Sequence, residues 1–339
     1  MIPVAEVLRC WHPQAVSASR SSPAERVWAR LPADTRAALE RELSPTDLQT
    51  LLLAVAKTRS RSVTPARLAQ RWREDAFVQP SKLDPRALSA MEAWLWERLP
   101  EDVEALELSP VAPFGTCAAL GGVDQNRVLS TTRTSEVVSD QTAVLALEAA
   151  RRRTETDGSV HLAAMHRVLR TQRFPEGFAQ HFRLLALVSS ARDVGSGLTE
   201  AGLLTMHLEF YASALCALFP TDVVRLRLAR FAGGPVAERL EDTVLPRLAS
   251  GLGNLEILDD PERSRGRGYY RDVAIRIDVV RDGVENEIGD GGFTDWTARL
   301  LADSKERCLT SCISTERIAT LTGRVTGGNG VGNHRGAHR

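Results

Sequence analysis

The sequence has almost no lysine, few aromatic residues and no net charge. Its 43 basic residues include only Lys57, Lys82 and Lys305 as lysines, and 43 acidic residues balance them. A chain without a net positive field is not drawn to nucleic acid or anionic lipid by its overall charge, although local patches remain possible. Since arginine carries nearly all the positive charge, one arginine is less informative here than in most proteins.

Cysteines are few and lack metal-ligand spacing. The set is Cys10, Cys117, Cys216, Cys308 and Cys312. An odd, scattered set that lacks metal-ligand spacing with histidine indicates reduced thiols rather than a disulfide framework or a zinc site. Cys308 and Cys312 lie four apart and could share a helix face, where we expect them to pack.

The N-terminus lacks a secretory signal pattern, and we find no apolar run that approaches membrane-spanning length. These absences predict a cytoplasmic protein. With 339 residues and 43% hydrophobic content, the chain can bury a large core and make one large or two ordinary domains.

The first hundred residues carry helix signals. Ser44, Thr64 and Asp84 each precede a proline, which places a capping side chain before a residue suited to the first helical position. Helical apolar spacing follows, and we expect both of its sets to pack in a core. The sets are Leu48, Leu51, Leu52 and Val55, and Leu88, Met91, Leu95 and Leu99.

Strand and turn signals dominate from residue 103. The segment VDQNRVLSTTR has a strand-like pattern, and a helix is expected after Asp140. HRVLRTQ and HFRLLALVSS flank the loop FPEGFAQ and predict two antiparallel strands. A long helix over 198–219, the alternating VVRLRLARF and a helix over 236–248 follow. The mixture predicts an α+β fold in which helices flank a mainly antiparallel sheet.

A hairpin is predicted between residues 265 and 296. Apolar residues alternate from Val273 to Ile277, and Asp282-Gly283 is typical of a tight turn. We expect the return strand to end at the GDGG turn, residues 289–292, where glycines let the backbone approach a ligand. Tyr269 and Tyr270 are adjacent, so strand alternation predicts one ring on each face of the sheet.

The order of these features resembles the catalytic core of class II aminoacyl-tRNA synthetases, and most of all histidyl-tRNA synthetase and its paralogues. LDPRALSAMEAWLWERLP with ELSPVAP resembles motif 1, LRTQRFPEGFAQHF motif 2 and SCISTERI motif 3. RGRGYY is similar to the histidine-binding RGLDYY signature, and GDGGFTDW to the AGGRYDGL turn. The resemblance covers 84–321. The helical segment over 1–83 is either an added partner-binding unit or a cover on the sheet, and we expect the cover. The glycine-rich tail over 322–339 is expected to be disordered.

The resemblance implies roles for particular side chains. Arg170 takes the position of the arginine that contacts the α-phosphate and the substrate carboxylate. Arg317 takes the position of the arginine that holds the γ-phosphate. Phe182 would pack on the adenine ring. Gln172, which replaces the family's glutamate, would hydrogen-bond the edge of the adenine. Substrate-binding positions fall at Arg133, Glu136, Tyr269, Tyr270, Gly291 and Gly292, with Glu136 pairing a substrate amine.

Such a site activates an acid by carboxylate attack on the α-phosphate of ATP. Arg170, Arg265 and Arg317 would then stabilise charge on the transition state, with Mg²⁺ neutralising the remaining phosphates. The sequence departs from the family at Ser311 and Ser314, which stand where glycines are preferred in motif 3. It also has an apolar strand after motif 2, which predicts a pocket less polar than one for histidine.

Two function classes follow. The first is an ATP-dependent enzyme that activates an amino acid or other small carboxylic acid as an acyl-adenylate and transfers it to a non-tRNA acceptor, since only the glycine-rich tail follows motif 3. The second is a catalytically silent paralogue that stabilises a protein partner, like the regulatory subunit of ATP phosphoribosyltransferase. An RNA-binding factor is a third class, disfavoured by the neutral overall charge. The motif 1 helix predicts a homodimer.

Overall fold

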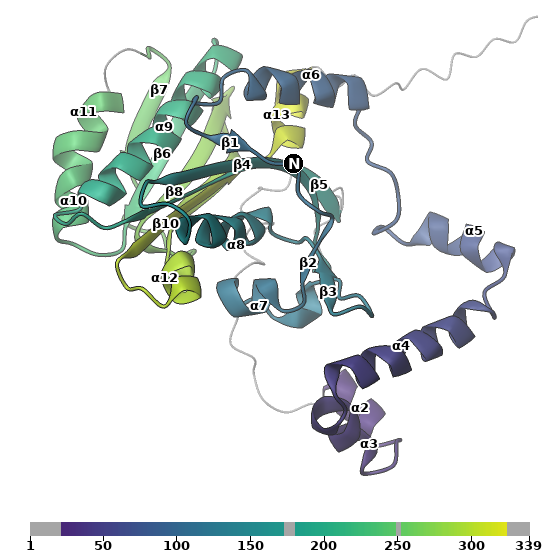
Figure 1. Ribbon diagram of the computed structural model, residues 1–339. Coiled ribbons are helices and arrows are strands. Elements are labelled where there is room, and N and C mark those ends of the chain that lie inside the picture. The colour runs from purple at the N-terminus through teal and green to yellow at the C-terminus, as the bar shows by residue number, and fades with distance from the viewer. Residues whose placement is uncertain (1–21, 173–179, 249–251, 324–339) are drawn as a thin grey trace, which may run out of the picture.

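The protein combines one large sheet with helices on both of its faces (Figure 1). The computed structural model describes residues 22–172, 180–248 and 252–323. Eight strands form the sheet in the order β1-β4-β5-β10-β9-β8-β6-β7. The outer pairs β1/β4 and β6/β7 are parallel and the five inner pairs are antiparallel. The predicted α+β class with a mainly antiparallel sheet is therefore confirmed.

The strands differ in length, and the longest lie at the centre of the sheet. Their bounds are β1 Glu104–Ala105, β4 Val160–Leu169, β5 His181–Arg192, β6 Val223–Arg230, β7 Leu255–Asp259, β8 Arg271–Arg281, β9 Val284–Thr294 and β10 Glu306–Ile313. A separate two-stranded sheet pairs β2 Val111–Pro113 with β3 Ser135–Val137. The segment from 123 to 133, predicted as a strand, instead begins with a 3-10 turn over Gln125–Arg127. Asp124 favours that turn because its side chain accepts from the Asn126 amide at 2.9 Å.

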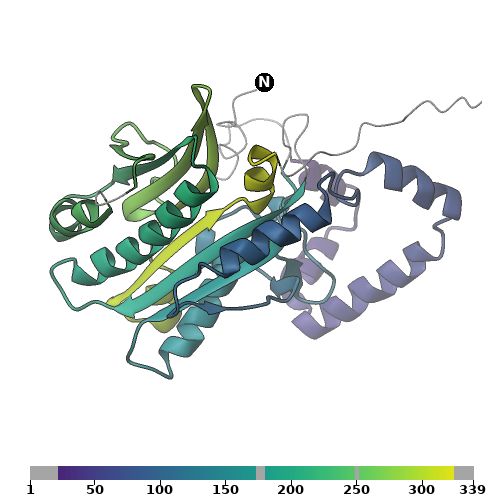
Figure 2. The ribbon, with the colours of Figure 1, turned by 90° about the horizontal axis from the view of Figure 1, so that it is seen from above.

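Each face of the sheet has its own helices. α6 (Pro85–Trp96), α9 (Leu198–Leu218) and α13 (Thr315–Leu321) cover one face, where α6 and α9 lie over the strands in Figure 2. α7 (Thr116–Gly121), α8 (Gln141–Arg153) and α12 (Trp296–Leu301) cover the other. The predicted helix over 236–248 forms as α10 Pro235–Arg239, a π turn Leu240–Val244 and α11 Leu245–Leu248.

Helix α9 is apolar nearly all round because it lies in the core. By length and composition it could cross a membrane, contrary to our expectation that no run reaches such a length. However, 67% of its apolar window is buried inside the protein. A long helix that is hydrophobic on every side is also typical of a soluble core.

The three proline-marked helix starts are confirmed. α4 (Pro45–Ser60), α5 (Pro65–Glu74) and α6 begin at the prolines, each with a capping side chain before it. Ser44 Oγ accepts from the Asp47 amide at 3.1 Å, and Asp84 Oδ1 from the Arg86 amide at 2.9 Å. These bonds satisfy amides that the helix leaves without partners.

The N-terminal helices do not pack as predicted. α2 (Pro23–Trp28), α3 (Thr35–Ala37), the π turn Ala38–Glu42, α4 and α5 contain no buried residue. They stand away from the sheet in Figure 1 instead of covering it. Apolar spacing predicts which face of a helix is apolar, but not whether another part of the same chain covers that face. Leu51, Leu52 and Val55 are accordingly exposed, whereas Leu88, Met91 and Leu95 in α6 are buried.

The hairpin of β8 and β9 forms around the predicted turn. Asp282 and Gly283 both have positive φ, 51° and 74°, as a two-residue turn of this kind requires. The predicted GDGG turn is wrong, because Gly289–Gly292 continue β9 to Thr294. A Cβ at Gly291 would lie 2.6 Å from the Ser311 Cβ of β10, so the glycine lets neighbouring strand atoms pack closely rather than ending the strand.

Candidate functional site

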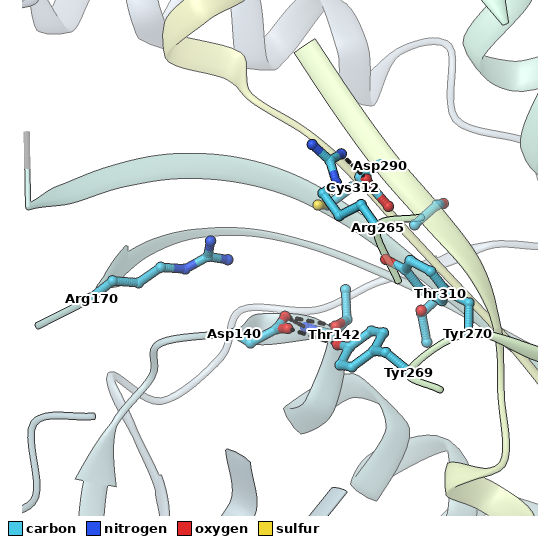
Figure 3. A pocket seen from close by; sticks show the side chains of 10 residues that line it. Asp140, Thr142, Arg170, Arg265, Tyr269, Tyr270, Asp290, Thr310 and Cys312 are labelled. Atoms are coloured by element: carbon cyan, nitrogen blue, oxygen red, sulfur yellow. Dashed lines mark hydrogen bonds and ion pairs between the residues drawn. The ribbon is translucent and has the colours of Figure 1, made fainter. Parts of the chain in front are cut away.

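A small cavity of about 60 Å³ lies where the central strands meet the start of α8. Its lining residues come from five segments of the chain, which Figure 3 shows approaching from different sides. They are Asp140, Thr142, Arg170, Arg265, Tyr269, Tyr270, Asp290, Thr310, Ser311 and Cys312. Four residues of the predicted site, Arg170, Arg265, Tyr269 and Tyr270, are thus brought together by the fold.

The two tyrosines lie in a turn that precedes β8. Both of their amides donate to the Gly266 carbonyl, at 3.0 Å for Tyr269 and 2.7 Å for Tyr270. Their rings meet edge to face with centroids 4.8 Å apart, so the prediction of one ring on each face of the sheet is wrong. Strand alternation does not apply to a turn, and Gly266 makes this turn possible: its φ is 87°, and a Cβ there would lie 2.7 Å from the Tyr270 ring.

Asp140 combines a structural and a cavity-facing role. Its Oδ1 accepts from the Thr142 amide at 2.9 Å and from the Thr142 hydroxyl at 2.6 Å, which caps α8. Its Oδ2 accepts from the Tyr269 hydroxyl at 3.4 Å. The Tyr269 ring also packs edge to face on Trp296, with centroids 5.7 Å apart. One wall of the cavity therefore carries a fixed carboxylate.

Arg265 is paired with two acidic residues of β9. Its Nη2 lies 2.5 Å from Glu287 Oε1, its Nη1 lies 3.1 Å from Glu287 Oε2, and it also contacts Asp290. Burial acts to lower the pKa of Arg265, but Asp290 and Glu287 outweigh it and hold the pKa above its usual range. Arg265 is therefore a cation that its own protein already neutralises.

Arg263, which the sequence did not single out, also pairs with Asp290. Its Nη2 donates to both oxygens of Asp290 at 3.0 Å, and its Nη1 donates to the Ile275 carbonyl at 3.0 Å. Burial acts to raise the pKa of Asp290, but the two guanidinium groups hold it below its usual value. For Glu287 burial prevails over Arg265, so the pKa of that carboxyl is raised.

Arg170 and Arg317 come from segments that lie far apart in the amino-acid sequence. Arg170 follows β4, is buried, donates from Nε to the Ser139 carbonyl at 3.1 Å and lies 5.2 Å from the Phe182 ring centroid. Arg317, in α13, donates to the Glu287 carbonyl at 2.7 Å. Burial lowers the pKa of Arg317, Glu287 opposes this, and both Arg170 and Arg265 lower it further. Arg317 does not line the cavity, but it contacts Glu287, the same residue whose carboxylate pairs with Arg265.

The remaining predicted residues have other surroundings. Glu136 is fully buried and accepts from the Gly115 amide at 2.8 Å, the Cys117 amide at 3.0 Å and Gln125 Nε2 at 2.9 Å. It thus orders the start of α7, and the structure engages its oxygens without a substrate amine. Arg133 is exposed and Gln172 is buried, and neither lines the cavity.

Gly291 and Gly292 lie in β9, where neighbouring side chains fill the space beside them. A Cβ at Gly292 would lie 2.7 Å from the Tyr270 ring. Cys308 and Cys312 lie on strand β10 and not on a helix. Cys308 packs in the core, whereas Cys312 is partly buried against the core and also lines the cavity. Burial raises the pKa of Cys308 to about 11 and that of Cys312 to about 12.

Comparison with known proteins identifies the fold. No protein-family model and no curated protein sequence matches the chain. A structure titled ATP phosphoribosyltransferase regulatory subunit/histidyl-tRNA synthetase from Bacillus halodurans is 9% identical, with a TM-score of 0.54 over 72% of this chain and 81% of that one. Histidyl-tRNA synthetase of S. aureus is 14% identical, with a TM-score of 0.50 over 74% of this chain and 70% of that one.

Histidyl-tRNA synthetase of Nostoc sp. is 12% identical, with a TM-score of 0.54 over 74% of both chains. At such low identities the similarity establishes the fold rather than an activity. The chain has a class II aminoacyl-tRNA synthetase-like core. The resemblance predicted from the order of motifs is thereby confirmed at the level of the fold.

Proposed function

We propose that the protein activates a small amino acid or other carboxylic acid with ATP and passes the acyl group to an acceptor other than tRNA. The observation that carries this proposal is that Arg170 and Arg265 line a cavity whose other wall holds Asp140. Arg317 is linked to this cavity through Glu287, which accepts from both Arg265 and Arg317. Arg170 and Arg265 both lower the pKa of Arg317. Such repulsion between like charges is relieved when an anionic ligand binds, so the group is suited to phosphates.

The reaction needs no side-chain nucleophile. A carboxylate oxygen of the acid attacks the α-phosphorus of ATP, the bond from that phosphorus to the bridging oxygen breaks, and pyrophosphate leaves with the electron pair. Arg170 and Arg317 would stabilise the charge that develops on the phosphoryl oxygens. Asp140 and the Tyr269 hydroxyl would hold a substrate amine at the other end of the cavity, since a carboxylate is the natural partner of an ammonium group.

The surroundings of the site fit a nucleotide that brings its own magnesium. Among residues 22–172, 180–248 and 252–323, no three His, Cys, Asp or Glu side chains converge as metal ligands. Mg²⁺ commonly binds through substrate phosphates with few protein ligands, so we propose that it enters with ATP. We also propose a cytoplasmic location, where the free thiols of Cys117, Cys216, Cys308 and Cys312 stay reduced.

Pyrophosphate exchange tests this proposal directly. Purified full-length protein is incubated with ATP, Mg²⁺ and labelled pyrophosphate, together with a panel of amino acids and other carboxylic acids. Exchange that depends on one acid, or on a chemically related group, is the expected result and names the substrate class. Exchange that is absent with every acid would contradict adenylation, and calorimetry with ATP then shows whether the nucleotide binds at all.

A silent paralogue that binds a small molecule and a protein partner is the second candidate. It is favoured by Arg265, whose charge Glu287 and Asp290 already satisfy, and by the small size of the cavity. A site of this kind would bind an amino acid without ATP. Amino-acid binding by calorimetry, combined with no pyrophosphate exchange, would favour this candidate over the enzyme.

We further propose a homodimer through α6, the helix that resembles motif 1. The inner face of this helix is buried through Leu88, Met91 and Leu95, while Ser89, Ala90 and Ala93 are exposed on its outer face. Small side chains of this kind let a second helix approach closely. Light scattering at micromolar concentration is expected to give the mass of two chains, and a monomer mass would contradict the proposal.

A further inference from the structure

The basic residues of this neutral protein are unevenly distributed. Between residues 57 and 73, at the end of α4, through the connection and along α5, there are six basic residues and no acidic one. We call this segment the basic arm. Its basic residues are Lys57, Arg59, Arg61, Arg67, Arg71 and Arg73. Overall charge balance therefore conceals a local positive patch.

The basic arm is exposed along its whole length. Every residue from 54 to 74 is exposed, and Figure 1 shows α4 and α5 away from the sheet. No helix of the core covers these side chains. A partner can therefore reach them without any rearrangement of the described fold.

The arm's charges are also largely uncommitted. Across the described ranges, its one ion pair joins Arg71 to Asp75 at 3.1 Å. Several arginines of the core, in contrast, form ion pairs: Arg183, Arg225 and Arg307 each lie within 3.0 Å of a carboxylate oxygen. The charge on the arm is thus available to an external anion, whereas these core arginines are already paired with carboxylates of the same protein.

Helix α5 adds an apolar and aromatic surface beside these charges. Leu68 and Trp72 are four residues apart and therefore share one side of the helix, where they are 58% and 55% exposed. Arg67 and Arg71 have the same spacing and lie next to them. Arginines that meet phosphates, next to an aromatic ring that stacks on a base, are the usual elements of single-stranded nucleic-acid recognition.

We propose that the basic arm binds RNA, with its arginines on phosphates and Trp72 stacked on an unpaired base. An anionic membrane fits less well, because two apolar side chains on a ten-residue helix bury little area in lipid. RNA fits better than duplex DNA because its loops present unstacked bases. This surface is separate from the cavity, so the proposal holds whether or not the cavity activates an acid.

Fluorescence anisotropy with a labelled oligouridine of about 20 nucleotides tests the proposal on the full chain. Six basic residues predict that the logarithm of the binding constant falls with that of salt with a slope of about −4. The triple variant Arg67→Gln, Arg71→Gln and Arg73→Gln should make the slope shallower by about 2 and weaken binding on the order of 100-fold at 0.1 M salt. Glutamine is a good helix former, so α5 should persist.

Two controls separate the arm from general charge. The variant Arg192→Gln, Arg239→Gln and Arg247→Gln removes the same charge from the core surface and should bind RNA as the parent does. Trp72→Ala should weaken binding on the order of 10-fold without changing the salt slope, and Trp72→Phe should restore most of it. The proposal is overturned if both triple variants lose affinity equally, or if the parent binds oligodeoxythymidine or phosphatidylserine vesicles more tightly than oligouridine.

Discussion

Replacing Arg317 by alanine should abolish nucleotide binding and reduce acid-dependent pyrophosphate exchange by a factor of about 100 or more, as loss of one preorganised donor does in other active sites. In the free protein this guanidinium donates a hydrogen bond to the Glu287 carbonyl and is repelled by Arg170 and Arg265. Because its neighbours disfavour its positive charge, the Arg317 guanidinium should be strongly stabilised when a phosphate anion binds beside it. The measurement is ATP affinity by calorimetry together with exchange rate.

The fold should survive the substitution. Arg317 is only partly buried, so water can reach the Glu287 carbonyl that it leaves, and the thermal midpoint should move by a few degrees at most. Arg192→Ala, at the far end of β5 and paired with Asp303, is the matched control and should leave both activities unchanged. Unchanged ATP affinity in the Arg317 variant would defeat the assigned role.

Four of the residues predicted for the site line one cavity, but the sequence did not predict how they are held. Arg170, Arg265, Tyr269 and Tyr270 meet at one cavity because local motifs and their order carry that information. The partners of Arg265 come from β9, at residues 22 and 25 positions further along the chain. Pairing of that kind depends on contacts distant in the sequence, which residue pattern alone does not specify.

Local propensity gives a wrong prediction at two other places in the chain. A run of glycines is typical of a turn, yet Gly289–Gly292 stay in a strand because β8 and β10 pair on both sides of them. The spacing of Leu51, Leu52 and Val55 correctly predicted a helix and wrongly predicted a core. Asp140 is the residue most easily missed, because capping α8 explains it fully until the cavity beside it is seen.

The acidic pair of β9 should make stability depend on pH in two opposing ways. The pKa of Asp290 is lowered by folding, so its contribution is present above its unfolded pKa and is lost as pH falls through its folded one. The pKa of Glu287 is raised, so its ionisation opposes folding as pH rises. In the parent protein these two contributions partly cancel in the weakly acidic range.

Replacing Arg265 by glutamine should remove that balance and destabilise the fold by about 3 kcal/mol at neutral pH, because it leaves buried carboxylates short of a partner. Asp290 keeps Arg263, but the one cation that Glu287 keeps among the described residues is Arg276, at 3.6 Å. The pKa of Glu287 should therefore rise further. Since the folded variant then binds a proton that the unfolded chain releases, the deficit should narrow as pH falls from 7.5 toward 5.

Urea unfolding across this pH range measures the effect, with Arg271→Gln as the matched control. Arg271 pairs with Asp295 at 2.5 Å on the exposed side of the same hairpin, so its loss should cost less than about 1 kcal/mol at every pH. A deficit in the Arg265 variant that is small or independent of pH would mean that Glu287 and Asp290 do not depend on this guanidinium. Arg265 would then be free to meet a substrate carboxylate, which would strengthen the case for the enzyme over the silent paralogue.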